Sequence, residues 1–192
     1  MLRELKYFAE VRAGYPFRGS VPEVADGAVM AVQMRDVSAS GGVAWDSVAR
    51  TNPEGRRQPD WLKAGDILFL MRGARNFAVC LEDVRAPAVC SQYFFLVRVR
   101  DSPLLLPEFL AWQINQQPAQ RYLGKNAEGT DQLSIRRGVL EALPISAPPI
   151  AQQRRLMSLA NAARREREVL QNLIDNRERQ LQALVLKLLK TS

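Results

Sequence analysis

The stretch Pro144-Ile145-Ser146-Ala147-Pro148-Pro149 divides the sequence into two parts of different composition. Proline is favoured in the first turn of a helix, where its missing N–H group leaves no hydrogen bond unmade. After Pro149 there is no further proline, glycine or aromatic residue, and Leu, Ala, Gln, Arg and Glu, which favour helix, predominate. The sequence therefore predicts one unbroken helix over residues 150–189, about 60 Å long at about 1.5 Å per residue. We expect most of it to project from the preceding domain.

One side of this predicted helix is apolar. The apolar residues follow three- and four-residue steps down that side and are Leu156, Ala160, Ala163, Leu170, Ile174, Leu181, Leu184 and Leu188. The opposite side carries charged and polar residues such as Arg165, Glu168 and Gln182. An apolar stripe on a projecting helix needs a partner helix from the same chain, from a second copy or from another protein. A helix that lies along its own domain is the alternative, but it accounts only for the first turns.

Residues 1–149 predict a mixed domain. Short β-rich runs at 29–34, 67–71, 77–81 and 89–99 are separated by turn signals such as Gly41-Gly42. Helices are expected over residues 2–11, from Pro107 with a restart at Pro118 as far as Leu123, and from a cap at Ser134 to Leu140. Strands and helices do not alternate regularly, which argues against a doubly wound parallel sheet. We expect the α+β class, with a mixed α/β domain at 1–149 and a long C-terminal helix at 150–192.

The composition excludes most catalytic chemistry. Histidine is absent, and Cys80 and Cys90 are the only cysteines, so His-based catalysis, His-ligated metals and four-thiolate zinc sites are excluded. The cysteine spacing suits neighbouring strands of a hairpin and permits a disulfide, but in a cytoplasmic chain we favour two reduced, buried thiols. Glycine-rich nucleotide-binding motifs are also absent. We therefore expect a protein that is not an enzyme, with no catalytic residue, no metal and no cofactor.

The net charge is +7. This excess favours an acidic partner, with nucleic acid as the default, although it also serves solubility. No apolar run reaches the roughly 18–20 residues of a membrane span. Glu4, Glu10, Glu23 and Asp26 lie where a signal peptide would be apolar. We expect a cytoplasmic protein without a membrane segment.

Several short blocks follow one another in a fixed order. They are EVRAGYPFRG at 10–19, QMRDV at 33–37, LKAGDILF at 62–69 with Arg72-Gly73, LVRV at 96–99, PEFLAW at 107–112, Gly129-Thr130 with Ile135, and LPISAPP at 143–149 with Gln152-Gln153. Each block alone is weak, but together they span almost the whole chain. The ordered set resembles one half of the DNA-specificity (S) subunit of type I restriction–modification systems.

The resemblance implies a target recognition domain at 1–149, which reads one part of a split DNA site, and a conserved spacer helix at 150–192. Such subunits normally contain two of each, with the spacer helices paired antiparallel, and they hold methyltransferase (M) and restriction (R) subunits. This sequence has one of each. A second copy would supply the missing helix through an intermolecular antiparallel coiled coil, giving a symmetric homodimer that reads an interrupted palindrome in double-stranded DNA.

Cationic and amide side chains in expected loops are the candidates for DNA contact. Lys and Arg neutralise phosphates, whereas Arg, Asn and Gln reach base edges. The candidates are Arg18, Arg35, Arg72, Arg75, Asn76, Lys125, Asn126, Gln132, Arg136 and Arg137. For each arginine, a solvated surface charge is the alternative.

Aromatic side chains are expected mainly in the core. Tyr15 and Phe17 have the alternative of stacking on a sugar or base, whereas Trp45, Trp61 and Trp112 are interpreted as packing residues. A competing hypothesis for the whole chain is a coiled-coil protein–protein adaptor that does not read DNA. On that view the globular part binds a protein, and its basic surface is incidental.

Overall fold

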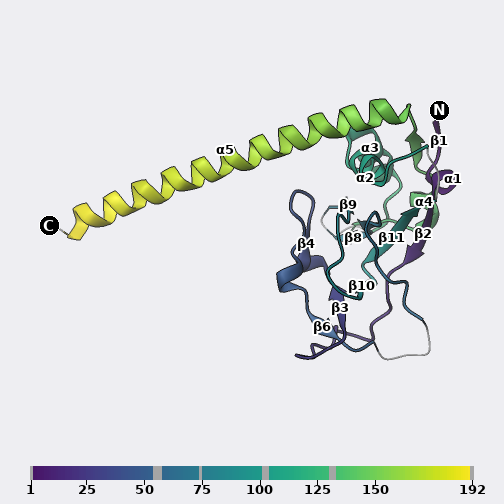
Figure 1. Cartoon of the computed structure of the whole chain (residues 1–192), viewed down its shortest axis with the longest axis horizontal. Coiled ribbons are helices and arrows are strands. Elements are labelled where there is room, and N and C mark those ends of the chain that lie inside the picture. The colour runs from purple at the N-terminus through teal and green to yellow at the C-terminus, as the bar shows by residue number, and fades with distance from the viewer. Residues whose placement is uncertain (1, 54–57, 74, 101–103, 130–132, 191–192) are drawn as a thin grey trace. The chain divides into compact units, whose positions relative to one another are not determined.

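The computed structural model describes residues 2–53, 58–73, 75–100, 104–129 and 133–190, except for the side chains of residues 188 and 190 (Figure 1). The chain is a mixed α/β domain with several small sheets, followed by the long C-terminal helix α5 (Ile150–Lys190). Its internal contacts divide it into two compact units, residues 1–154 and 155–192. Within the described ranges, none of the helices combines the length and hydrophobicity needed to cross a bilayer.

An antiparallel sheet of four strands forms the centre of the first unit. Its strands lie in the order β2 (Ala9–Ala13), β11 (Phe94–Val99), β7 (Ile67–Leu70) and β9 (Ala78–Cys80). All four residues of β7 are buried, which explains why its sequence is a continuous apolar run rather than an alternating one. The expected strands at 67–71 and 77–81 are thus confirmed with small differences in their ends.

A second, mixed sheet packs into the same core. Strand β3 (Val29–Val32) pairs in parallel with β10 (Ala88–Cys90) and antiparallel with β6 (Arg50–Thr51). Met30 and Val32 of this sheet share one buried cluster with Leu68, Leu70 and other residues of the first sheet. One continuous core therefore holds the two sheets together.

Shorter elements complete the unit. Three two-stranded pairs join β1 (Leu2–Glu4) to β13 (Pro144–Ser146), β4 (Val37–Ser38) to β5 (Gly42–Val43), and β8 (Arg72–Gly73) to β12 (Leu133–Ser134). The helices are α1 (Leu5–Phe8), α2 (Pro107–Ile114), α3 (Gln117–Lys125) and α4 (Arg137–Glu141), with 3₁₀ turns at Met34–Asp36 and Trp45–Ser47. The prolines at the starts of α2 and α3 match their expected positions.

Three expectations about local structure are wrong. Residues 2–11 are not one helix, because Leu2–Glu4 pairs with β13 and Ala9–Ala13 pairs with β11, leaving only α1 between them. The run 89–99 is broken at residues 91–93, so that β10 and β11 belong to different sheets. Ser134 lies in β12 rather than capping a helix, and α4 starts after Arg136 with no side-chain cap. In each case pairing between distant segments overrides the local pattern.

The cysteines lie in different sheets. Cys80 ends β9 and Cys90 ends β10, so they are not neighbours in a hairpin, and both thiols are free. Cys90 is buried and Cys80 partly buried. Burial raises the pKa of each thiol to about 12, which keeps both protonated and poorly nucleophilic at neutral pH.

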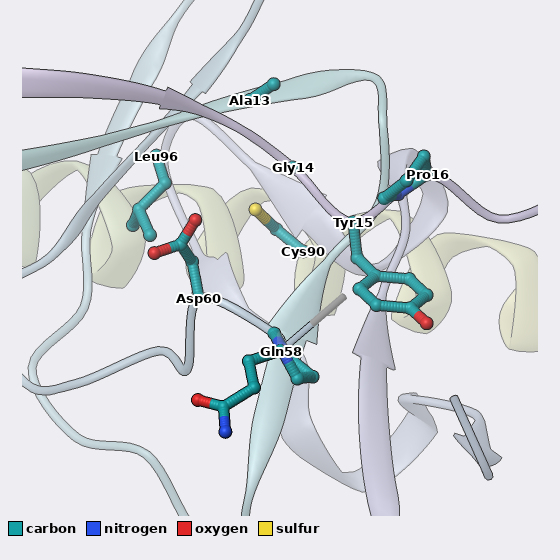
Figure 2. A pocket seen from close by; sticks show the side chains of 9 residues that line it. Ala13, Gly14, Tyr15, Pro16, Gln58, Asp60, Cys90 and Leu96 are labelled. Atoms are coloured by element: carbon teal, nitrogen blue, oxygen red, sulfur yellow. The ribbon is translucent and has the colours of Figure 1, made fainter. Parts of the chain in front are cut away.

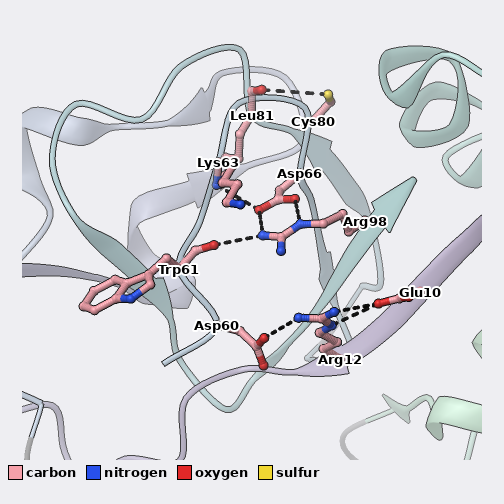
Figure 3. A network of polar contacts seen from close by, with 9 residues as sticks. All are labelled: Glu10, Arg12, Asp60, Trp61, Lys63, Asp66, Cys80, Leu81 and Arg98. Carbon is pink, nitrogen blue, oxygen red and sulfur yellow. Dashed lines mark hydrogen bonds and ion pairs between the residues drawn. The ribbon is translucent and has the colours of Figure 1, made fainter. Parts of the chain in front are cut away.

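Two arginines connect loops to the central sheet (Figure 3). Arg98 on β11 donates to both carboxylate oxygens of Asp66 at 2.7 Å and to the carbonyl of Trp61 at 2.8 Å. Asp66 is only 2% exposed, and it also accepts the backbone N–H of Lys63 at 2.8 Å. Hydrogen bonding to Asp66 raises the pKa of Arg98. The second arginine, Arg12 on β2, donates to Asp60 at 2.6 Å and to Glu10 at 2.7 Å.

The first turn of α5 belongs to the first unit, and one buried amide connects it to neighbouring backbone. Gln153 is fully buried; its Oε1 accepts the backbone N–H of Leu106 at 2.9 Å. Its Nε2 donates to the carbonyls of Leu104 and Pro148 at 2.8 and 2.7 Å. Gln153 therefore stabilises the junction that the proline cluster introduces.

Candidate nucleic-acid interface

Strands β8 and β12 bring together two segments that are far apart in the sequence. Arg72 lies opposite Ser134 in this pair. The backbone N–H of Ile135 donates to the carbonyl of Met71 at 2.9 Å, while Ser134 and Glu128 exchange backbone hydrogen bonds of 2.8 and 3.0 Å. Arg72 and Gly73 therefore lie beside Leu133 and Ser134, and Glu128 lies next to Ser134.

This β8–β12 region carries six exposed candidates. They are Arg72, Arg75, Lys125, Asn126, Arg136 and Arg137. Arg136 pairs with Glu128 and Arg137 with Glu141, each at 2.7 Å. Arg72, Arg75 and Lys125 have no ion-pair partner among the described residues. These three cations are therefore available to an external anion.

Of the three amide candidates, Asn76 is buried instead of exposed, Asn126 is exposed with one side-chain donor already bonded, and Gln132 is not described. Asn76 is 7% exposed and its Nδ2 donates to the carbonyl of Leu70 at 3.0 Å, so its amide holds the segment after β8 instead of facing solvent. Asn126 is exposed, but its Nδ2 donates to the carbonyl of Tyr122 at 2.8 Å and so closes the end of α3. Gln132 lies outside the described residues.

Arg18 and Arg35 lie in a different part of the unit, next to a groove of about 370 Å³. Arg35 lines this groove, and Arg18 stands between two of its lining residues, Phe17 and Gly19. Arg35 is exposed and pairs with Glu23, and Asp36 lies 3.8 Å from its Nε. Because a surface ion pair contributes little stability, Arg35 can exchange Glu23 for another anion at small cost.

The groove and the β8–β12 region are connected through the backbone. The turn at residues 91–93 lines the groove, and the carbonyl of Tyr93 accepts the N–H of Met71 at 3.1 Å. Met71 immediately precedes Arg72. Gln92 and Tyr93, both exposed, are not among the predicted candidates, because the apolar run 89–99 that contains them predicts one continuous strand. The interruption itself, Ser91-Gln92-Tyr93, was the available signal.

The aromatic residues follow the expected pattern with one exception. Tyr15 and Phe17 are 9% and 8% exposed and their ring centroids lie 4.8 Å apart, so they pack in the core. Trp45 is buried, and Trp112 stacks on Phe109 at 5.6 Å. The packing role expected for Trp61 is wrong, because 40% of it is exposed.

A smaller cavity lies beside Gly14 and Tyr15 (Figure 2). Its volume of about 10 Å³ is the size of one water molecule. Its one carboxylate, Asp60, is already paired with Arg12. A side chain at Gly14 would lie 2.1 Å from the carbonyl oxygen of Ser91, so this close approach requires glycine. The described residues contain no group of three or more Cys, Asp or Glu side chains placed to hold a metal ion.

In the second unit, most of the apolar residues expected in the stripe on α5 are exposed. Leu170, Ile174, Leu181 and Leu184 are each between 51% and 62% exposed. Among the other residues expected in the stripe, Leu156 and Ala163 are exposed and Ala160 is partly buried, while the side chain of Leu188 lies outside the description. Within the second unit, over the part of α5 whose side chains the structure describes, these stripe residues are not covered by other residues of the helix.

No protein-family model and no curated protein matches the sequence. Among solved structures, the chain is similar to the S subunit of a type I restriction–modification system from M. genitalium (TM-score 0.51, 14% identity, 76% of this chain and 33% of that one). It is also similar to the HsdS subunit from Thermoanaerobacter tengcongensis (0.60, 14%, 86% and 37%). A third similar chain comes from a study of the structural basis of complex assembly and conformational transition in the type I R-M system. Its TM-score is 0.64 and its identity 15%, and the match covers 96% of this chain and 43% of that one.

At identities of 14–15%, these matches show a shared fold. The chain has the fold of one part of a type I specificity subunit, and it spans 33–43% of the length of those chains. The resemblance found in the sequence blocks is thus confirmed at the level of the fold.

Proposed function

We propose that this chain is a DNA-specificity subunit of a type I restriction–modification complex, with residues 1–149 reading DNA and residues 150–192 acting as a spacer and dimerisation helix. The observation that carries the proposal is the β8–β12 pairing, which places Arg72 opposite Ser134, two residues before Arg136. Arg72 and the nearby Arg75 are exposed and have no ion-pair partner among the described residues. The pairing occurs in a chain whose fold is that of a specificity subunit.

In this proposal the unpaired cations bind phosphates and set the affinity. Releasing counterions from DNA makes such binding strongly dependent on salt. Arg136 and Arg137 are held by carboxylates in the free chain and join the interface by exchanging these surface partners for phosphates. The chain itself is not an enzyme and binds no cofactor; M subunits, and an R subunit where one accompanies them, supply the chemistry.

The exposed stripe on α5 supports a homodimer. Two copies that pair their helices antiparallel bury the leucines that are exposed in one copy. The symmetry of such a pair presents two identical reading domains in opposite orientations, so the target is an interrupted palindrome with a fixed spacer.

A second candidate function is a coiled-coil adaptor that does not read DNA. The same exposed stripe favours it, because an apolar helix face binds a partner protein equally well. The two functions differ in what they require of Arg72 and Arg75. The adaptor uses neither residue to bind nucleic acid.

Changing Arg72 and Arg75 together to alanine tests the proposal. We expect the affinity for duplex DNA to fall about 10-fold and the slope of log K against log salt to become shallower by about 2, one for each lost phosphate contact. Fluorescence anisotropy with a labelled duplex over a salt series, with the M subunit present, measures both quantities.

The matched control removes the same charge from α5, by changing Arg165 and Arg179 to alanine. The proposal predicts an unchanged slope for this control. Equal slopes for the unaltered chain and the Arg72/Arg75 variant contradict phosphate binding by these residues. A chain that is indifferent to DNA even with the M subunit present supports the adaptor.

A further inference from the structure

The groove beside Arg35 has no role yet in the proposed interface. Gln33, Met34, Arg35, Gln92 and Tyr93 are among the residues that line its volume of about 370 Å³. Met34 is 41% exposed and Tyr93 38% exposed. The groove thus combines apolar walls with amides and one cation, which is the side-chain chemistry that base edges require.

Three backbone contacts hold the turn that carries Gln92. The N–H of Ser91 donates to the carbonyl of Val32 at 2.9 Å, and Ser91 also forms a parallel bridge with Tyr15. The N–H of Met71 donates to the carbonyl of Tyr93 at 3.1 Å. A side chain on such a turn is presented from a rigid base, which lowers the entropy cost of binding through it.

The groove also contains polar atoms that lack partners. The buried Oγ of Ser91 and the buried Nε2 of Gln33 have no hydrogen-bond partner within the described part of the chain. Buried polar groups are normally paired. Ser91 and Gln33 both line the groove, but these two atoms are buried in the free chain, so a ligand bonds to them only if the side chains rearrange.

The exposed arginines at the groove, and its backbone connection to the β8–β12 region, favour duplex DNA as the ligand. Arg35 is exposed and lines the groove, and Arg18 is exposed between the lining residues Phe17 and Gly19. The Tyr93–Met71 hydrogen bond connects the groove to the residue before Arg72, for which we propose phosphate binding. The groove and Arg72 are thus carried by backbone segments that are hydrogen-bonded to each other, which suits a ligand long enough to contact both.

From these observations we infer that the groove is a base-reading site and that Gln92 is its specificity-determining residue. The inference rests on the proposed function and adds to it the residue that distinguishes bases. Gln92 is exposed and has no hydrogen-bond partner among the described residues, so both halves of its amide are available. A glutamine amide matches the N6 and N7 groups of adenine in the major groove, while Met34 offers an apolar surface to the thymine methyl group.

Selection of bound sequences from a random duplex library tests this assignment. For the chain with Gln92→Ala, we expect the preference for adenine at one position of the site to fall about 10-fold. The salt slope stays unchanged, because a neutral side chain neutralises no phosphate. For Gln92→Glu, we expect the preference at that position to move from adenine to cytosine, whose N4 amino group donates to a carboxylate.

Gln152→Ala is the matched control, because Gln152 is an exposed glutamine outside the groove. We expect the Gln152→Ala variant to select the same DNA sequence as the unaltered chain. A selected site that is also unchanged in both Gln92 variants, or a uniform loss of affinity for all sequences, overturns the role of Gln92 while leaving the proposed function intact. An unaltered chain that selects no sequence contradicts the proposed function and this inference together.

Discussion

Replacing Asp66 with alanine is expected to lower the free energy of unfolding by about 3 kcal/mol, because it leaves a partly buried guanidinium without its carboxylate. Asp66 is 2% exposed and makes two 2.7 Å hydrogen bonds with Arg98. It also accepts the backbone N–H of Lys63, which shapes the turn before β7. Removing the Asp66 carboxylate therefore breaks the connection between this loop and Arg98 on β11, and it also removes the hydrogen bond that shapes the turn at Lys63. Urea unfolding followed by circular dichroism measures the change.

Asp46→Ala is the matched control for this measurement. Asp46 also pairs with an arginine, Arg85, at 2.5 Å, but its side chain is 93% exposed. An exposed pair contributes at most about 1 kcal/mol, so we expect the control to unfold almost like the unaltered chain. Similar losses in the two variants would show that the burial of Asp66 contributes nothing beyond a surface ion pair.

Replacing both Leu170 and Leu181 with glutamate is expected to raise the dissociation constant of the proposed homodimer at least about 100-fold. Each buried leucine contributes roughly 1.5–3 kcal/mol, and the new carboxylates would have to be buried or the helices separated. Glutamate favours helix almost as well as leucine, so α5 itself remains helical. Sedimentation equilibrium at micromolar concentration measures the constant.

Gln182→Glu provides the control for the helix. It adds a negative charge next to Leu181 but about 100° further round the helix and outside the stripe, so the dimer is expected to persist. An unaltered chain that remains monomeric at micromolar concentration contradicts the homodimer. A double variant that still dimerises shows that this stripe is not the contact surface.

The parts of the fold that local sequence determines were predictable. The proline cluster and the absence of any later breaker indicated α5, and prolines marked the starts of α2 and α3. The helix predicted over residues 2–11 is wrong, because the strands in this range exist only through partners at β13 and β11. A local hydrophobic pattern contains no information about such distant partners.

The candidate interface was predictable as a set of residues but not as a surface. Arg72 and Arg136 were recognised as separate loop cations, and their proximity follows from the β8–β12 register. The buried amide of Asn76 donates a hydrogen bond to the carbonyl of Leu70, and no sequence motif predicts this bond. Gln92 was missed because a short turn within an apolar run resembles a strand. The sequence thus supplied the chemical groups, and the tertiary pairing supplied their arrangement.

The central claim, that two copies of one reading domain are held at a fixed separation by paired helices, is tested most directly by varying the spacer of the selected DNA site. The account predicts two identical half-sites in inverted orientation, and a large loss of affinity when about 5 base pairs are inserted between them, since this turns one half-site to the opposite face of the duplex. A site that is not repeated, or an affinity that does not depend on the spacer, would contradict it.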